Sequence, residues 1–139
     1  MHKREAEIEI ASSYNTLSLI RSFARTYFDV ENISEGDKIK LVSVIDELTT
    51  NVIEHAYAGE SSEENRVKIL LKIENGVVYA KVEDFGIGFK ERKKSKDEGG
   101  FGLKIVEGIV ESIKIFPKNK GTIVEVTKKV KEEEIRNAY

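Results

Sequence analysis

Three polar residues that could carry chemistry recur at every fourth position of the stretch VIDELTTNVIEHAY (44–57): Glu47, Asn51 and His55. Four steps of a 3.6-residue helix return a side chain to nearly the same face, so these residues form one polar row on a helix. A carboxylate and a carboxamide one turn apart can act as a general base and a metal ligand. Such a row is also common on the solvated edge of an ordinary helix, so its meaning depends on the rest of the chain.

The same stretch carries the apolar pattern of a buried helix face. Apolar residues recur at spacings of three and four at Leu41, Ile45, Leu48, Val52 and Ala56. The run 34–37 (SEGD) resembles a capping box and predicts the start of this helix, which we expect to end near Tyr57. Upstream, alternation at 7–10 predicts a short strand, and helical spacing after Ser12-Ser13 predicts a helix to about Asp29.

A β-hairpin is predicted between residues 66 and 84, because apolar residues alternate on both sides of a two-residue Asn75-Gly76 turn. Counting outward from that turn gives the pairs Glu74–Val77, Ile73–Val78, Leu71–Ala80, Ile69–Val82 and Val67–Asp84. The other face sets Lys68 near Glu83 and Lys72 near Tyr79. Asp84 therefore points toward the core at the end of a strand, where a carboxylate needs a partner.

The second half of the chain alternates glycine-rich turns with short predicted elements. A charged run at 90–98 lies between Gly86-Ile87-Gly88 and the sequence 99–102 (GGFG). Helical spacing follows at Leu103, Val106, Ile109/Val110 and Ile113, and two strands are predicted at 113–116 and 122–127. This order predicts one α+β domain over residues 1–139, a two-layer sandwich whose mixed, mostly antiparallel sheet is covered on one face by three main helices.

The composition excludes several kinds of site. The 139 residues are 40% hydrophobic and 35% charged with a net charge of −2, which gives no electrostatic case for direct nucleic-acid binding. There is no cysteine, which removes disulfides, thiol catalysis and cysteine-based metal sites, and two histidines are too few for a histidine-rich one. No apolar run approaches the roughly 18 residues of a membrane helix, and residues 1–10 lack a signal peptide's apolar region, so we expect a cytoplasmic protein without a membrane partner.

Taken singly, the nucleotide-binding motifs are weak. Asp84-Phe85-Gly86 matches the DFG of eukaryotic protein kinases, but the chain is too short for that fold and has no H-R-D loop or V-A-I-K strand. No P-loop sequence occurs, and residues 100–102 lack the third glycine of a dinucleotide-binding turn. The joint order is much more specific: E-x-x-x-N-x-x-x-H-A-Y, then D-x-G-x-G, then G-G-x-G-L, then G-T.

This order of motifs resembles the GHKL (Bergerat-fold) ATPases, the superfamily of gyrase, Hsp90, MutL and the histidine-kinase catalytic domains. Within it, a stand-alone domain of this length resembles the bacterial anti-sigma factor serine/threonine-protein kinases of the stress and sporulation switches. The resemblance covers nearly the whole chain. It implies a Bergerat-type fold and the cofactors ATP and Mg²⁺.

The resemblance also implies a role for each matching residue. Glu47 matches the catalytic general base, and Asn51 the Mg²⁺ ligand. Asp84 matches the acceptor of the adenine amino group, and Thr122 a threonine near the adenine, although an ordinary strand residue is an equal alternative. His55 is better interpreted as a cleft-lining support than as a phospho-acceptor. The remaining positions expected at the nucleotide are Gly86, Gly88, Gly99, Gly100, Phe101, Gly102 and Leu103, with a lid over about residues 89–100.

One position departs from the pattern. We expect a basic residue just before the glycine pair to neutralise the γ-phosphate, but Asp97-Glu98 precede Gly99. The basic residues at 92–94 and 96 are close enough in sequence to substitute, and a solvated loop is the alternative interpretation of the same run.

By resemblance, the partners are a sigma factor and a serine-bearing anti-sigma factor antagonist, with a homodimer formed through the N-terminal strand and first helix. Two other functions stay open. The first is the ATP-binding domain of a histidine-kinase-like sensor, which needs a neighbouring helical domain for which this chain has no room. The second is a catalytically inactive module that only sequesters its partner.

Overall fold

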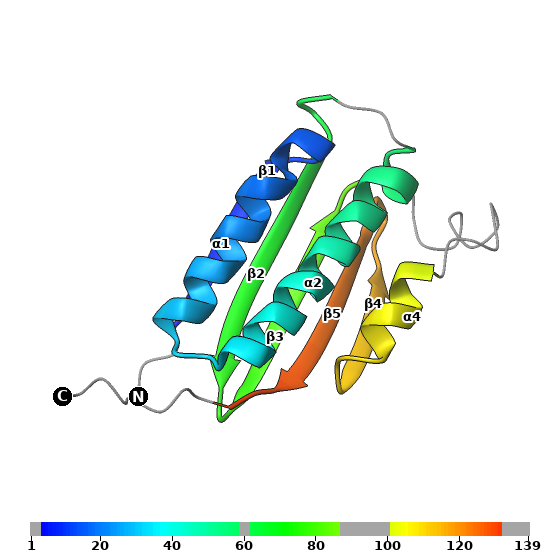
Figure 1. Ribbon diagram of the computed structural model, residues 1–139. Coiled ribbons are helices and arrows are strands. Elements are labelled where there is room, and N and C mark those ends of the chain that lie inside the picture. The colour runs from blue at the N-terminus through cyan, green and yellow to red at the C-terminus, as the bar shows by residue number, and fades with distance from the viewer. Residues whose placement is uncertain (1–3, 59–61, 87–100, 132–139) are drawn as a thin grey trace.

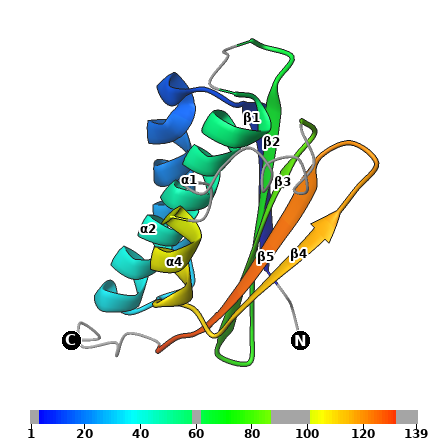
Figure 2. The same cartoon turned by 90° about the vertical axis from the view of Figure 1, so that its right-hand side faces the viewer.

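The computed structural model describes residues 4–58, 62–86 and 101–131, which form a five-stranded sheet with helices on one face (Figure 1). The strands are β1 (Glu5–Ala11), β2 (Arg66–Glu74), β3 (Val77–Asp84), β4 (Ser112–Pro117) and β5 (Thr122–Lys129), in the order β1-β2-β3-β5-β4. Figure 2 shows the helices and the sheet as two layers. The predicted α+β fold is confirmed. Within it, each of the four pairings between these strands is antiparallel, so the mixed character that we expected is not found among the described strands.

The helical layer consists of α1 (Leu17–Val30), α2 (Glu35–Asn51) and α4 (Phe101–Glu107), with a 3₁₀ turn η1 (Tyr14–Thr16) before α1. Ser34 caps α2 as predicted, because its Oγ accepts a hydrogen bond from the Asp37 backbone N at 3.3 Å. The expectation that α2 continues to about Tyr57 needs a correction. Regular α-helical geometry ends at Asn51 and a π-helical turn, η2 (Val52–Ala56), follows it.

The predicted hairpin register is confirmed over the whole β2–β3 pair, from Glu74 opposite Val77 to Val67 opposite Asp84. Asn75 and Gly76 both have positive φ angles, of 54° and 75°, as a type I′ turn requires. On the solvated face Lys68 lies opposite Glu83, and the Lys72 ammonium lies 5.0 Å from the centre of the Tyr79 ring. The turn and the alternation together therefore decide which face of β3 carries Asp84.

The hydrophobic core lies between the two layers. Its largest fully buried side chains come from both layers: Phe28, Ile20, Leu41, Ile45 and Ile53 from the helices, and Ile69, Leu71, Val67, Val78 and Val82 from the strands. Except for Ile53, these are apolar positions that the helical and alternating spacings predicted. The packing fixes the end of α2 against the end of β3.

Two later elements differ from the prediction. Helix α4 ends at Glu107, before the helical positions expected at Ile109/Val110 and Ile113. Ile113 lies in β4 instead, which confirms the strand predicted at 113–116. Strand β5 continues past Thr127 to Lys129. The last part of the charged tail, residues 132–139, lies outside the described residues. Within the described part of the chain, no helix is long and apolar enough to cross a membrane.

Candidate functional site

Asp84 and Thr122 form a buried polar pair at one end of the sheet. Asp84 is the last residue of β3, Thr122 is the first residue of β5, and the two lie opposite each other in the antiparallel register. Asp84 is 1% exposed and Thr122 is fully buried, so the inward direction predicted for Asp84 is confirmed. The Asp84 Oδ1 accepts a hydrogen bond from the Gly86 backbone N at 3.0 Å, which holds the chain in a tight turn directly after the strand.

The Thr122 hydroxyl is an unsatisfied polar group. Among the described residues its Oγ1 finds no hydrogen-bond partner, although the side chain has no contact with solvent. A buried hydroxyl without a partner costs free energy, so native proteins rarely keep one that has no function. A bound ligand with a donor or acceptor at this position would satisfy it. The site therefore fits a polar ligand beside the Asp84 carboxylate.

The strand ends are shaped by a glycine in the turn before β5. Gly121 has a φ angle of +100°, in the region that favours glycine. A Cβ atom at this position would also overlap the Asp84 carbonyl oxygen and lie 2.7 Å from the Phe85 Cα. The turn between β4 and β5 therefore packs directly against the backbone that carries Asp84. This contact explains why a glycine stands directly before Thr122.

The polar row of the central helix lies at the same end of the molecule, where the C-terminal end of α2, the end of β3 and the start of β5 come together (Figure 1). Glu47 and Asn51 occupy the last two turns of α2, and His55 follows on the π-helical turn; all three side chains are half-buried. The π turn abuts the backbone after Asp84, since a Cβ atom at Gly86 would overlap the carbonyl oxygen of Ala56. The fold thus brings the first two sequence motifs into contact.

Tyr57 is a residue of this site to which sequence reasoning gave no role. Its hydroxyl donates a hydrogen bond to the Arg66 carbonyl oxygen at 2.8 Å and accepts one from the Phe85 backbone N at 2.9 Å. Its own backbone N bonds the Val52 carbonyl oxygen at 3.2 Å and closes the π turn. No local pattern signals this role, because Arg66 and Phe85 are 9 and 28 residues away in sequence.

A second tyrosine contacts the π turn from a distant segment of the chain. The Tyr14 hydroxyl donates a hydrogen bond to the Glu54 Oε2 at 2.8 Å, which ties η1 to the turn that carries His55. This hydrogen bond to a carboxylate is the main reason why the pKa of Tyr14 is raised above its usual value. π-helical turns are rare and often occur at functional sites. The side chains of Tyr14 and Tyr57 tie this one to distant segments of the chain.

The remaining predicted positions fall largely in one segment. Gly88, Gly99, Gly100 and the lid over about 89–100 lie outside the described residues. Phe101 and Gly102 form the start of α4, and the half-buried Leu103 packs against the core. Within the described ranges, no group of three or more histidine, aspartate or glutamate side chains could hold a metal ion.

Comparison with known proteins agrees with this geometry. Residues 10–128 match the model of the histidine kinase-like ATPase domain family. Serine-protein kinase RsbW from Staphylococcus aureus (strain JH9) is 26% identical over 145 residues, which cover 94% of this chain and 90% of the kinase. RsbW proteins of several other strains of that species match equally well. The resemblance drawn from the motifs is thereby confirmed.

Solved structures share the fold at low sequence identity. The RsbU and RsbW domains of Rv1364c from Mycobacterium tuberculosis superpose with a TM-score of 0.73 and 22% identity, covering 93% of this chain and 32% of that one. The SiaB-SiaC complex from Pseudomonas aeruginosa gives a TM-score of 0.67 at 13% identity, covering 91% and 88%. Because the family model matches residues 10–128, most of this chain, the chain belongs to the histidine kinase-like ATPase domain family.

Proposed function

We propose that the protein is an ATP-dependent serine/threonine-protein kinase that acts as an anti-sigma factor. It would phosphorylate a serine of an anti-sigma factor antagonist and sequester a sigma factor. The observation that carries the nucleotide part is the buried Asp84–Thr122 pair beside the end of α2, in which the Thr122 hydroxyl has no partner in the part of the chain that the structure describes. Membership of an ATPase family implies ATP as the nucleotide. The relative named as a serine-protein kinase, which aligns over 94% of this chain, supports the phosphoryl-transfer part.

At the base end of the site, Asp84 would accept a hydrogen bond from the adenine amino group, and Thr122 would contact the base directly or through a water. The lack of contact between these side chains and solvent supports this role, since a hydrogen bond made in a water-excluded site discriminates strongly between ligands. Guanine presents a carbonyl where adenine has its amino group. Asp84 would therefore favour ATP over GTP.

At the phosphate end, the Asn51 carboxamide oxygen would hold Mg²⁺, a hard cation that prefers oxygen ligands. When bound, ATP would supply the phosphoryl group, and Mg²⁺ would neutralise the charge on it. Glu47, one turn earlier on α2, would take the proton of the attacking serine hydroxyl, a contribution of roughly 10²–10⁴-fold. His55 would line the cleft as a support, and Gly86, Gly88 and the segment 99–103 would let the backbone approach the nucleotide.

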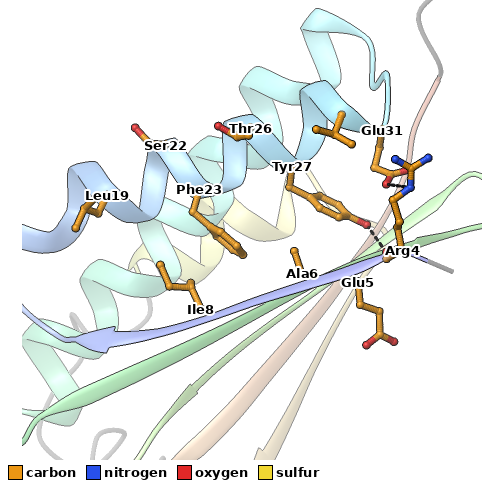
Figure 3. A pocket seen from close by; sticks show the side chains of 11 residues that line it. Arg4, Glu5, Ala6, Ile8, Leu19, Ser22, Phe23, Thr26, Tyr27 and Glu31 are labelled. Atoms are coloured by element: carbon orange, nitrogen blue, oxygen red, sulfur yellow. Dashed lines mark hydrogen bonds and ion pairs between the residues drawn. The ribbon is translucent and has the colours of Figure 1, made fainter.

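A homodimer through β1 and α1 belongs to the same proposal. An apolar groove of about 550 Å³ runs between these elements, with Ile8, Leu19, Phe23 and Val30 among the residues that line it (Figure 3). Leu19 and Val30 are more than half exposed, and β1 is the edge strand of the sheet. Leu19→Arg should lower the sedimentation coefficient to that of a monomer. Ile39→Arg, an equally exposed apolar position on α2, should not, and a monomeric parent protein would contradict the dimer.

Thermal unfolding with Mg-ATP, Mg-ADP and Mg-GTP tests the nucleotide site. A ligand at about 100 times its Kd stabilises the fold by roughly 2.7 kcal/mol, so we expect a clear shift with the two adenine nucleotides only. Asn51→Ala should diminish the Mg-ATP shift, and Ser43→Ala, at an exposed position on the same helix, should leave it intact. The absence of a shift with any nucleotide would favour the inactive sequestering module.

Transfer of labelled phosphate from ATP to candidate antagonists tests the kinase reaction. Glu47→Ala should abolish transfer and spare ATP binding. Asp46→Ala is the matched control, because Asp46 lies next to Glu47 but forms an ion pair with Arg21 at 2.6 Å. Equal transfer rates for Glu47→Ala and the parent would remove Glu47 from its role. Acid-labile phosphohistidine on a partner, instead of phosphoserine, would favour the histidine-kinase alternative.

A further inference from the structure

The Tyr57 hydroxyl joins three segments that the proposed site needs in fixed positions. Tyr57 follows the π turn η2, donates to the Arg66 carbonyl oxygen at the start of β2, and accepts from the Phe85 N just past the end of β3. The phenol ring also lies against Gly86, since a Cβ atom built there would come within 2.8 Å of the Tyr57 Cε1. One side chain therefore connects the helix that carries Asn51 with the turn that follows Asp84.

The turn after Asp84 is held by two neighbouring bonds to side chains. The Phe85 N donates to the Tyr57 hydroxyl at 2.9 Å, and the Gly86 N donates to the Asp84 Oδ1 at 3.0 Å. Because these two amides are consecutive, the first bond limits the rotation of the peptide that presents the second. Loss of the Tyr57 hydroxyl would therefore allow the Asp84 carboxylate to take more orientations, even though Tyr57 makes no charged contact with the ligand.

We propose that Tyr57 is a positioning residue for recognition of the purine base: its hydroxyl holds the 84–86 turn so that the Asp84 carboxylate faces an exocyclic amino group. This proposal rests on the nucleotide-binding function proposed above and extends it to a specificity determinant. Tyr57 acts through Asp84 and does not itself contact the base. A residue with this role changes the choice between bases, whereas a residue that only stabilises the fold changes the affinities for all nucleotides alike.

The variant that isolates the hydroxyl is Tyr57→Phe, which keeps the ring against Gly86. The probes are Mg-ATP and Mg-ITP, because inosine has a carbonyl oxygen in place of the adenine amino group and gains nothing from a carboxylate there. Isothermal titration gives both Kd values. The change removes both hydrogen bonds of the hydroxyl, the one to the Arg66 carbonyl oxygen and the one from the Phe85 N. Loss of the bond from the Phe85 N should raise the Kd for ATP about three- to tenfold and leave that for ITP nearly unchanged, so the preference for ATP falls by the same factor.

Tyr27→Phe is the matched control. The Tyr27 hydroxyl donates to the Arg4 carbonyl oxygen at 2.9 Å, so this variant also loses a bond from a tyrosine to a backbone carbonyl, but between α1 and the residue before β1. Tyr57→Phe loses in addition the bond from the Phe85 N. Tyr27→Phe should lower the melting temperature and keep the parent's ATP-to-ITP preference. A preference that falls equally in both variants would show a general effect of stability and overturn the positioning role.

The outcomes separate the two proposals. If the parent discriminates ATP from ITP and Tyr57→Phe discriminates equally well, the positioning role is wrong and the role of Asp84 stands. If the parent binds both equally or binds neither, the base contact of Asp84 fails and the positioning role fails with it.

A measurement on the unmodified chain covers the case in which Tyr57→Phe does not fold. The Phe85 amide should be protected from hydrogen exchange before any nucleotide is added, because its acceptor belongs to the protein. Exchange of that amide at the rate of a free peptide would overturn the proposal.

Discussion

Replacement of Asp84 by asparagine is the sharpest test of how the site selects its ligand. The change keeps the side-chain size and an oxygen for the Gly86 N, but it removes the charge and turns the second oxygen into an NH₂ group. Asp84 is 1% exposed, so water cannot replace the lost acceptor. A hydrogen bond to a charged group contributes about 1.5–3 kcal/mol, which predicts a loss of ATP affinity of roughly 10- to 100-fold.

Thermal unfolding converts this loss into a measurable shift. At a Mg-ATP concentration of about 100 times the parent's Kd, the parent gains roughly 2.7 kcal/mol of stability. If Asp84→Asn binds about 30-fold more weakly, the same concentration is only about three times its Kd, and the gain falls to roughly 0.9 kcal/mol. The nucleotide-induced rise in melting temperature should therefore shrink to about one third.

Glu83→Gln provides the matched control. Glu83 is the adjacent residue of β3, but it points to the other face of the sheet, where its Oε2 contacts the Lys118 ammonium at 2.5 Å. Its neutralisation should leave the Mg-ATP shift unchanged. An Asp84→Asn protein that keeps the parent's full shift would show that this carboxylate does not contact the base, and the reasoning from its burial would be refuted.

Two further predictions concern the scaffold. Asp37→Ala should lower the free energy of unfolding by about 2–4 kcal/mol in urea titrations. The Asp37 carboxylate accepts a hydrogen bond from the Lys131 N at 2.8 Å and lies 3.7 Å from the Lys128 ammonium. It also lies in the first turn of α2, where a negative charge stabilises the helix. Asp29→Ala breaks a more exposed ion pair and should cost less than about 1 kcal/mol; equal losses would contradict the Asp37 contacts. Burial raises the pKa of Tyr27 from 10 to about 12, so stability should be complete below pH 10 and fall as the pH rises from 10 through 12. Tyr27→Phe should remove that alkaline loss, and an unchanged pH profile would refute the assignment.

The parts of the fold that sequence predicts well are those decided by neighbours along the chain. The β2–β3 register follows from the Asn75-Gly76 turn and from alternation, both of which act within a few residues. That register alone correctly places Asp84 on the core face. The Ser34 cap of α2 is equally local and is observed.

The parts that sequence predicts poorly depend on contacts between distant segments. Apolar spacing extends the central helix to Tyr57, and it cannot distinguish an α-helical end from the π turn observed after Asn51. The spacing that continued to Ile113 was equally ambiguous, because a residue at a helical position also suits a buried strand position, and pairing with β5 decides in favour of β4.

The candidate site depends both on patterns of neighbouring residues and on contacts between distant segments. The sequence supplies Glu47, Asn51 and Asp84 as candidates, since their types and spacing are visible without a structure. The Thr122 hydroxyl has no hydrogen-bond partner among the described residues. This property depends on the β3–β5 pairing, which joins residues 38 positions apart, and on the burial of Thr122. The role of Tyr57 likewise depends on a 28-residue separation. Motifs can therefore name candidate ligand contacts, whereas a residue proposed to position such a contact is found only where the fold brings distant segments together.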